Sequence, residues 1–229
     1  MLVKKYKSRV VSILNPFKGI YTLEFKSLNG NFKYHPGQFL HLAIDTDYDG
    51  SGQWPESRCF SMQSNPGESN IRITYSVKGK FTKLMENYLK MGSEVWLKLP
   101  YGDLFSQEHS KVNTAFIAGG TGITPYLSLF TFKDFIQYKN PILYAGFGHR
   151  SLNLYSEQLE EAISINKCFR IFLYYQDKDG ILDIGAILTN SDLKTSFFIS
   201  GPPFMIKEFK KYLLANNINE NQIRTDNWE

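Results

Sequence analysis

The first part of the chain, to about residue 100, consists of short runs in which apolar and polar residues alternate. The alternation is clearest at Tyr21–Phe25, Ile71–Val77 and Val95–Leu99. A period of two is typical of antiparallel strands with one buried face. The predicted strands lie near residues 6–14, 20–27, 38–44, 58–64, 71–77 and 94–99, with one helix over about 82–90. Six short strands joined by Asn, Gly and Pro turns favour a small antiparallel β-barrel.

After Asp103 the pattern changes to apolar runs that alternate with segments of helical periodicity. The predicted strands are 114–118, 141–146, 169–175, 196–200 and 222–226, and the predicted helices are 125–137, 154–164, 183–189 and 203–216. This alternation predicts a five-stranded parallel sheet with helices on both faces. The polar stretch Ser106–Lys111 is typical of a linker, so we expect two domains, 1–106 and 112–229.

Composition narrows the choice of partners and location. The chain has 229 residues, two cysteines and a net charge of +4. Two cysteines are too few for a zinc or iron–sulfur site of their own, so we expect no metal. No apolar run reaches membrane-spanning length, and no signal-peptide block follows the basic N-terminus, so we expect a cytoplasmic protein. A dense basic stripe is missing, which argues against nucleic acid, whereas mild basicity suits an acidic protein partner.

A glycine-rich turn between a predicted strand and helix is the first candidate binding element. It comprises Gly119, Gly120, Thr121 and Gly122, followed by Thr124 and Pro125. Glycines allow a sharp turn and close approach of the backbone, and a helix N-terminus favours phosphate. We expect Thr124 to cap the helix and Pro125 to occupy its first position. The alternative is a tight strand-to-helix connection without a ligand.

A second candidate combines Arg58-Cys59-Phe60-Ser61, on a barrel strand, with the segment Lys78–Thr82 before the helix. Arg58 offers a planar set of donors for phosphate oxygens, Phe60 a flat apolar face and Ser61 a hydroxyl donor. Gly79 before Thr82, at the expected helix start, forms a second anion site. A ligand with a flat ring system and a pyrophosphate, such as FAD, satisfies all of these groups. The alternatives are a surface ion pair for Arg58, a core position for Phe60 and a buried apolar role for Cys59.

Five short motifs occur in the order found in the ferredoxin–NADP reductase family. Arg58–Ser61 resembles its Arg-x-Tyr/Phe-Ser flavin motif, and Gly79–Thr82 resembles its Gly-x-x-Ser/Thr pyrophosphate loop. Leu99–Phe105 resembles its Gly-Pro-Tyr-Gly-x-Phe turn, with Leu99 in place of the first glycine. Gly119–Pro125 resembles its pyridine-nucleotide turn, and Ser200–Met205 its Cys-Gly-Pro-Pro-x-Met segment. The resemblance covers nearly the whole chain.

The resemblance implies an N-terminal barrel that binds FAD and a C-terminal Rossmann-like α/β domain that binds NADPH or NADH. Hydride then passes from the nicotinamide to flavin N5, with the two atoms about 3–3.5 Å apart. Electrons continue to an external acceptor such as ferredoxin, flavodoxin or an oxygenase component. The residues implied at the chemical step are Ser61, Thr121 and Ser200. Those implied in cofactor binding are Arg58, Cys59, Phe60, Ser61, Ser76, Val77, Gly79, Lys80, Phe81, Thr82, Gly119, Gly120, Thr121, Gly122, Arg150, Gly201, Pro202, Met205 and Trp228.

The chain departs from the family pattern at several positions. Ser200 replaces the frequent cysteine beside the nicotinamide, and Phe60 replaces the more usual tyrosine. Trp228 either covers the flavin face or packs at the end of the last strand. Arg150 with Ser151 favours the 2′-phosphate of NADPH, although Arg150 also suits a solvated loop.

Two other function classes remain open at this stage. The first is a non-catalytic FAD-binding electron-transfer or regulatory subunit, which the complete Gly119–Pro125 turn argues against. The second is a Rossmann-like domain for another nucleotide, in which Arg58–Ser61 and Gly79–Thr82 have no role.

Overall fold

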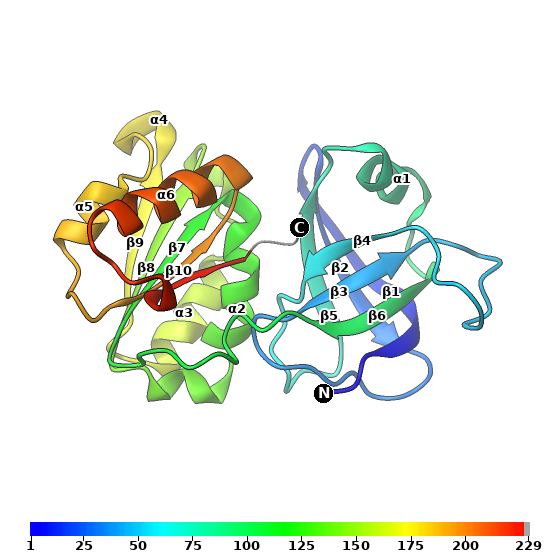
Figure 1. The fold of residues 1–229 in the computed structure, drawn as a ribbon. Helices are drawn as coiled ribbons and strands as arrows, with labels where there is room; N and C mark the ends of the chain where they lie inside the picture. Colours follow the sequence, from blue (N-terminus) through cyan, green and yellow to red (C-terminus); the bar gives the residue numbers. More distant parts are fainter. Residues whose placement is uncertain (227–229) are drawn as a thin grey trace. The chain divides into compact units, whose positions relative to one another are not determined.

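The computed structural model describes residues 1–226, which form two compact units that divide after Asp103 (Figure 1). The first unit is a six-stranded antiparallel sheet in the order β4-β3-β6-β1-β2-β5. Its elements are β1 (Lys4–Phe17), β2 (Ile20–Ser27), β3 (Phe39–Ala43), β4 (Ser57–Ser61), β5 (Ile71–Ser76), α1 (Lys80–Tyr88) and β6 (Glu94–Tyr101). The alternating residues of β2, β5 and β6 point into one apolar core, which confirms the predicted antiparallel barrel.

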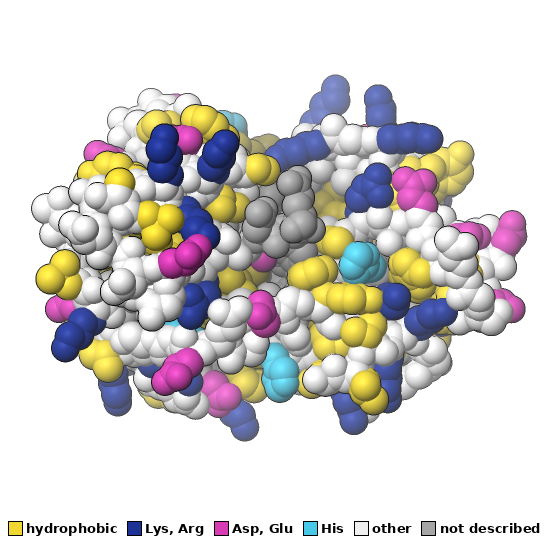
Figure 2. Space-filling view, in the orientation of Figure 1, with side chains coloured by type: hydrophobic (Ala, Val, Ile, Leu, Met, Phe, Trp, Pro, Cys, Tyr) yellow, Lys and Arg dark blue, Asp and Glu magenta, His cyan; other side chains and the backbone are white. Residues whose placement is uncertain are grey.

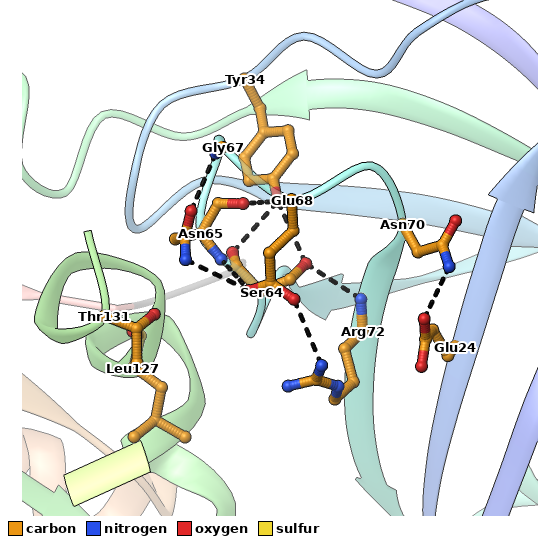
Figure 3. Close-up of polar contacts among 10 residues, drawn as sticks. All are labelled: Glu24, Tyr34, Ser64, Asn65, Gly67, Glu68, Asn70, Arg72, Leu127 and Thr131. Carbon is orange, nitrogen blue, oxygen red and sulfur yellow. Dashed lines mark hydrogen bonds and ion pairs between the residues drawn. The ribbon is translucent and has the colours of Figure 1, made fainter. Parts of the chain in front are cut away.

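Buried polar contacts join the segments at the two edges of this sheet, β4 and β5. The Gln63 N–H, just after β4, donates to the Arg72 carbonyl at 2.8 Å, and the Arg72 N–H donates to Ser64 Oγ at 3.0 Å. Figure 3 shows the Tyr34 hydroxyl directed at Ser64 and Asn65, and it reaches the Asn65 carbonyl at 2.9 Å. Burial raises the pKa of Tyr34 far above its ordinary value, so this donor keeps its proton. These contacts nearly close the sheet into a barrel.

Helix α1 lies across one end of the barrel (Figure 1). Phe81, Met85 and Leu89 repeat at the spacing of one helix face and are buried in the barrel core. The helix starts at Lys80, two positions before the predicted Thr82, because Gly79 takes the N-cap position.

The second unit is a five-stranded parallel sheet in the order β11-β10-β7-β8-β9. Its strands are β7 (Asn113–Gly119), β8 (Asn140–Phe147), β9 (Arg170–Tyr175), β10 (Ser196–Ser200) and β11 (Ile223–Thr225). Its helices are α2 (Thr124–Phe130), α3 (Ser156–Ile165), α4 (Gln176–Asp179), α5 (Ile184–Thr189) and α6 (Pro203–Ala215). Short 3₁₀ turns cover Gly120–Ile123, Lys133–Gln137, Arg150–Leu152 and Glu220–Gln222.

Helices cover both faces of this sheet, as predicted (Figure 1). Phe116 and Ala118 of β7 pack in the core formed with α2 and α3, whereas Ala115 and Ile117 pack in the core formed with α5 and α6. The chain runs from β7 to β8 and β9 on one side and returns to β10 on the other side of β7. The gap between the carboxyl ends of β7 and β10 is therefore the topological switch point, where sheets of this kind bind ligands.

The predicted helix 125–137 is wrong in its second half. Helix α2 ends at Phe130, and a separate 3₁₀ turn follows. Phe130 and Phe135 both contact the ring of Phe169, with ring centroids 4.7 and 5.0 Å apart. In one continuous helix, positions five apart differ by about 140° around the axis, so the chain breaks the helix to bury both rings.

The expected linker 106–111 packs on the second unit. Leu104 is buried in the core of this unit, and the Phe105 ring lies 5.1 Å from that of Phe198. His109 Nε2 lies 2.6 Å from the Tyr138 hydroxyl and Nδ1 lies 2.8 Å from the Gln107 carbonyl. The chain therefore divides before this stretch and not within it. Within residues 1–226, none of the helices combines the length and apolar character needed to cross a bilayer.

The environment of His109 generates a pH prediction. Burial, together with the nearby Lys111 and Arg224 charges, lowers the pKa of His109 below its ordinary 6.5. Because His109 binds a proton more readily in the unfolded chain, the free energy of unfolding decreases as the pH falls below about 6.5. We expect His109→Gln to weaken this acid-side loss in urea unfolding between pH 7 and 5. The exposed His35→Gln should retain the wild-type slope, and equal slopes in all three proteins would contradict the assignment.

Candidate functional site

In the first unit, Arg58 lies at the start of helix α1. Its guanidinium carbon is 5.4 Å from the centroid of the Phe81 ring, and Phe81 is the second residue of that helix. Arg58 donates to the Ser57 carbonyl at 2.8 Å and pairs with Glu56 at 3.4 Å. Both side chains of this pair are more than half exposed, so the pair is weak and leaves the guanidinium accessible.

Two backbone N–H groups of the loop before α1 are already bonded within the protein. The Thr82 hydroxyl accepts the N–H groups of Lys78 at 3.0 Å and Gly79 at 3.1 Å. Thr82 is thus the third helical residue and reaches back to the loop, which differs from its expected place at the helix start. The N–H of Gly79 is therefore engaged, and the phosphate donors available at this helix start are the first-turn N–H groups of Lys80, Phe81 and Thr82.

Strand β4 divides the predicted flavin motif between its two faces. Arg58 and Phe60 pair with the core-facing residues Leu42 and Leu40 of β3, and Phe60 packs against the barrel core with its ring 5.9 Å from that of Tyr75. Cys59 alternates to the other face, where its sulfur lies 3.6 Å from His41 Nε2. Burial raises the pKa of the Cys59 thiol, so Cys59 stays protonated there.

The remaining predicted residues of this site lie around the end of β5. Ser76 is its last residue, and the N–H of Val77 donates to the Gly19 carbonyl at 2.7 Å. The Phe81 side chain is buried in the barrel core, so only its backbone faces the loop. Ser61 ends β4, on the Cys59 face.

These groups fit the pyrophosphate of a dinucleotide such as FAD. A Cβ built on Gly79 meets no atom within 4 Å, so the loop is open to a ligand there. The exposed Arg58 and the lysines at 78 and 80 place positive charge around the same helix start. The structure thus brings together Arg58, Gly79, Lys80 and the first turn of α1.

In the second unit, two turns meet at the switch point with their backbones in contact. A Cβ on Gly122 would lie 2.6 Å from backbone atoms of Gly201 and Ser200. A Cβ on Gly119 would lie 2.8 Å from Pro202 and 3.0 Å from the Met205 sulfur. Both glycines are therefore needed for packing between the turns.

Gly120 differs from its two neighbouring glycines. It has φ +55°, and a Cβ built on it meets no atom within 4 Å. Within this fully described turn, Gly120 is the glycine that leaves open space in front of the backbone, where a phosphate can approach.

The helical start after this turn differs from expectation. The chain is already helical from Gly120, so the Thr124 hydroxyl donates to the Thr121 carbonyl at 2.9 Å and does not cap the helix. The N-cap position of α2 is Ile123. Pro125 lies in the first turn of α2, where a missing N–H leaves no bond unmade.

Ser200 is buried and bonded to a residue that the sequence reasoning did not select. Its hydroxyl lies 3.0 Å from Asp226 Oδ2, and the Asp226 N–H donates to the Ile199 carbonyl at 3.0 Å. A hydroxyl that gives its proton to a carboxylate does not give it to a nicotinamide at the same time. One signal was available: Asp226 follows β11 and Ser200 ends β10, and the carboxyl ends of adjacent parallel strands meet at one edge of the sheet.

The other predicted residues lie at the same carboxyl edge. Gly201 and Pro202 form the turn into α6, and Arg150 is exposed in the 3₁₀ turn after β8. Beside Arg150, a short hydrogen bond joins His149 Nδ1 and Ser151 Oγ. Trp228 lies outside the described residues. No group of metal-ligating side chains occurs within residues 1–226.

No family model matches the chain, but a search of known proteins finds sequence relatives. The reductase component of propane 2-monooxygenase from Mycolicibacterium smegmatis is 25% identical over 247 aligned positions, covering 99% of this chain and 68% of that protein. The electron transfer component of 2-halobenzoate 1,2-dioxygenase from Burkholderia cepacia is 27% identical over 80% of this chain and 56% of its own length.

Solved structures share the whole fold. A ferredoxin NADP⁺ reductase from Neisseria gonorrhoeae, with bound FAD and NADP, has a TM-score of 0.80 at 17% identity and matches 98% of both chains. A flavohemoglobin from Malassezia yamatoensis has a TM-score of 0.82 at 20% identity, over 97% of this chain and 60% of that one. The chain therefore shares the fold of these structures and resembles reductase and electron transfer components in sequence, as the motifs indicated. It spans about two thirds of the propane monooxygenase reductase component and about half to two thirds of several other relatives.

The contact between the turns yields a stability prediction. Gly122→Ala places a methyl group against the Gly201 backbone, so the turns must separate, and we expect a loss of about 2–4 kcal/mol in the free energy of unfolding. Gly120→Ala enters open space and should cost only about 1–2 kcal/mol, for its positive φ. Urea unfolding of both variants measures the difference. Equal losses would show that the two turns do not pack as described.

Proposed function

We propose that this chain is a flavin-dependent reductase that takes hydride from NAD(P)H and passes electrons to a separate acceptor. The observation that carries the proposal is the presence of one phosphate-binding element in each unit. The first is Arg58 with the start of α1, and the second is the open backbone at Gly120 beside the switch point. We further infer a cytoplasmic site of action, in line with the composition.

In the first unit we assign FAD to Arg58, Phe60 and the loop Lys78–Thr82. Arg58 and the first-turn N–H groups of α1 bind the pyrophosphate, and Phe60 offers its ring to the flavin. Bound FAD supplies a ring that accepts a hydride and releases electrons singly. Tyr75, which contacts Phe60 edge to face, fixes the orientation of that ring.

In the second unit we assign the nucleotide phosphates to the backbone of Gly120–Gly122, with Thr121 toward the nicotinamide. Gly119 and Gly122 contribute by allowing the two turns to approach. Ser200 acts as a positioning residue that holds Asp226 at the edge of the sheet, since its hydroxyl is bonded to that carboxylate.

We propose NADPH as the preferred donor. Arg150 is exposed after β8, beside Ser151 and His149, so a guanidinium and hydroxyl are available at the place where this fold recognises the second ribose. A 2′-phosphate forms charge-assisted hydrogen bonds with such groups.

We propose an oxygenase component or its ferredoxin as the acceptor. Among the relatives, reductase or electron transfer components of propane 2-monooxygenase, methane monooxygenase and 2-halobenzoate 1,2-dioxygenase recur. The net charge of +4 favours an acidic surface on this acceptor.

The proposed function is tested with one variant in each unit. Purified wild-type protein should be yellow, and anaerobic NADPH or NADH should bleach it. Arg58→Ala should lose most of its flavin on gel filtration while keeping its circular dichroism spectrum. Gly120→Val should keep the flavin but bleach at least about tenfold more slowly, because the side chain fills the phosphate position. A yellow wild-type protein that neither nucleotide bleaches would instead support a non-catalytic flavin subunit.

Donor preference is tested at Arg150. Loss of a charge-assisted contact costs about 1.5–3 kcal/mol, so Arg150→Ala should raise the KM for NADPH roughly tenfold to hundredfold and leave the KM for NADH unchanged. Lys194→Ala removes an exposed charge before β10 and serves as the control. Equal changes for both nucleotides would assign Arg150 to their shared diphosphate.

A further inference from the structure

The outward side of helix α1 carries apolar side chains that the barrel does not cover. Leu84 and Tyr88, four residues apart on this side, are 36% and 66% exposed, and Met91 in the following turn is 64% exposed. The opposite side of the same helix is buried, with Met85 fully inaccessible. This surface, the α1 face, consists of Leu84, Tyr88 and Met91 with the lysines described next.

Positive charge surrounds this apolar strip. Figure 2 shows Lys and Arg side chains gathered over α1, next to an apolar patch. Beyond the two lysines of the pyrophosphate loop, Lys83 and Lys90 are exposed, and neither forms an ion pair with another described residue. Between Lys78 and Met91, Glu86 is the only acidic residue, and its carboxylate accepts the Tyr21 hydroxyl at 3.0 Å. The positive charge of the α1 face is therefore not neutralised locally.

We propose that the α1 face is the docking surface for an acidic electron-acceptor protein. The proposal rests on the proposed function, because it assigns the acceptor of that reaction to a place on this chain. Charge complementarity selects the occupant: two unpaired lysines beside three apolar side chains match a surface with carboxylates around an apolar centre. The same two charges steer an acidic protein from solution, an effect that salt weakens.

The position of the α1 face suits electron transfer. Arg58 contacts Phe81 at the start of the same helix, so the docking surface and the assigned FAD site belong to one unit. A lipid surface or a second copy of this chain has no comparable role in the reaction. Binding of either one at the α1 face would therefore contradict the proposal.

The experiment compares a protein acceptor with a small neutral one. NADPH-driven reduction of an acidic [2Fe–2S] ferredoxin and of menadione is measured for FAD-loaded wild-type protein and two variants, Lys83→Glu/Lys90→Glu and Leu84→Ser/Tyr88→Ser/Met91→Ser. We expect each variant to raise the KM for ferredoxin about tenfold, with kcat and menadione turnover unchanged. The wild-type KM should rise with salt, and the charge variant should lose most of this dependence. Ferredoxin should also protect the amides of residues 80–91 from hydrogen exchange.

Matched controls come from the second unit. Another short turn and the residues just after it carry one exposed apolar residue, Ile136, and two exposed lysines, Lys133 and Lys139. Lys133→Glu/Lys139→Glu and Ile136→Ser should leave the KM for ferredoxin unchanged. An equal rise of the KM for ferredoxin in these controls would indicate a general effect of net charge and would overturn the proposal.

Further outcomes separate the docking proposal from the proposed function. Failure to reduce menadione would refute the function itself. Menadione reduction without ferredoxin reduction would overturn the docking proposal alone. Binding to phosphatidylserine vesicles, lost in both variants while the KM for ferredoxin stays constant, would assign the α1 face to a lipid surface. A dimer in analytical ultracentrifugation that both variants dissociate would assign it to self-association.

Discussion

The site in the second unit depends on the close approach of two backbone turns at the carboxyl ends of β7 and β10. Gly122 and Gly201 approach so closely that no side chain fits at Gly122. This approach is possible because the two strands are neighbours with every β10 residue buried, so their ends are held in register. The contact positions Gly120, the open glycine of this turn, beside the switch point. Strand order thus determines where a nucleotide can bind.

In the first unit, side-chain contacts position the candidate site. Contacts among Gln63, Ser64 and Arg72 nearly close the barrel, and the buried side of α1 covers one end. The Thr82 hydroxyl accepts two loop N–H groups, and these bonds restrain the loop before α1. A preorganised loop binds a pyrophosphate with less loss of conformational entropy than a flexible one.

Much of this arrangement could be predicted from local sequence patterns. Period-two alternation located all six barrel strands, and the alternation of apolar runs with helical segments located the parallel sheet. The errors arose where distant contacts decide. Helix 125–137 breaks because Phe130 and Phe135 share one core partner, and Thr124 is no cap because the preceding turn is itself helical. Asp226 was missed because its partner, Ser200, is remote in sequence and becomes adjacent only through strand order.

A series of contacts links the assigned flavin site to the α1 face. Phe60 meets Tyr75 edge to face, Tyr75 stacks on Tyr21 at 5.5 Å, and the Tyr21 hydroxyl is bonded to Glu86 of α1. Burial raises the pKa of Tyr75, and burial together with the Glu86 contact raises the pKa of Tyr21, so both hydroxyls remain protonated at physiological pH. Helix α1 is therefore linked to β4 at its start, through Arg58, and to β2 near its carboxyl end, through Glu86. Because the helix is held at two points, its backbone has a defined place relative to the ring of Phe60 within the first unit.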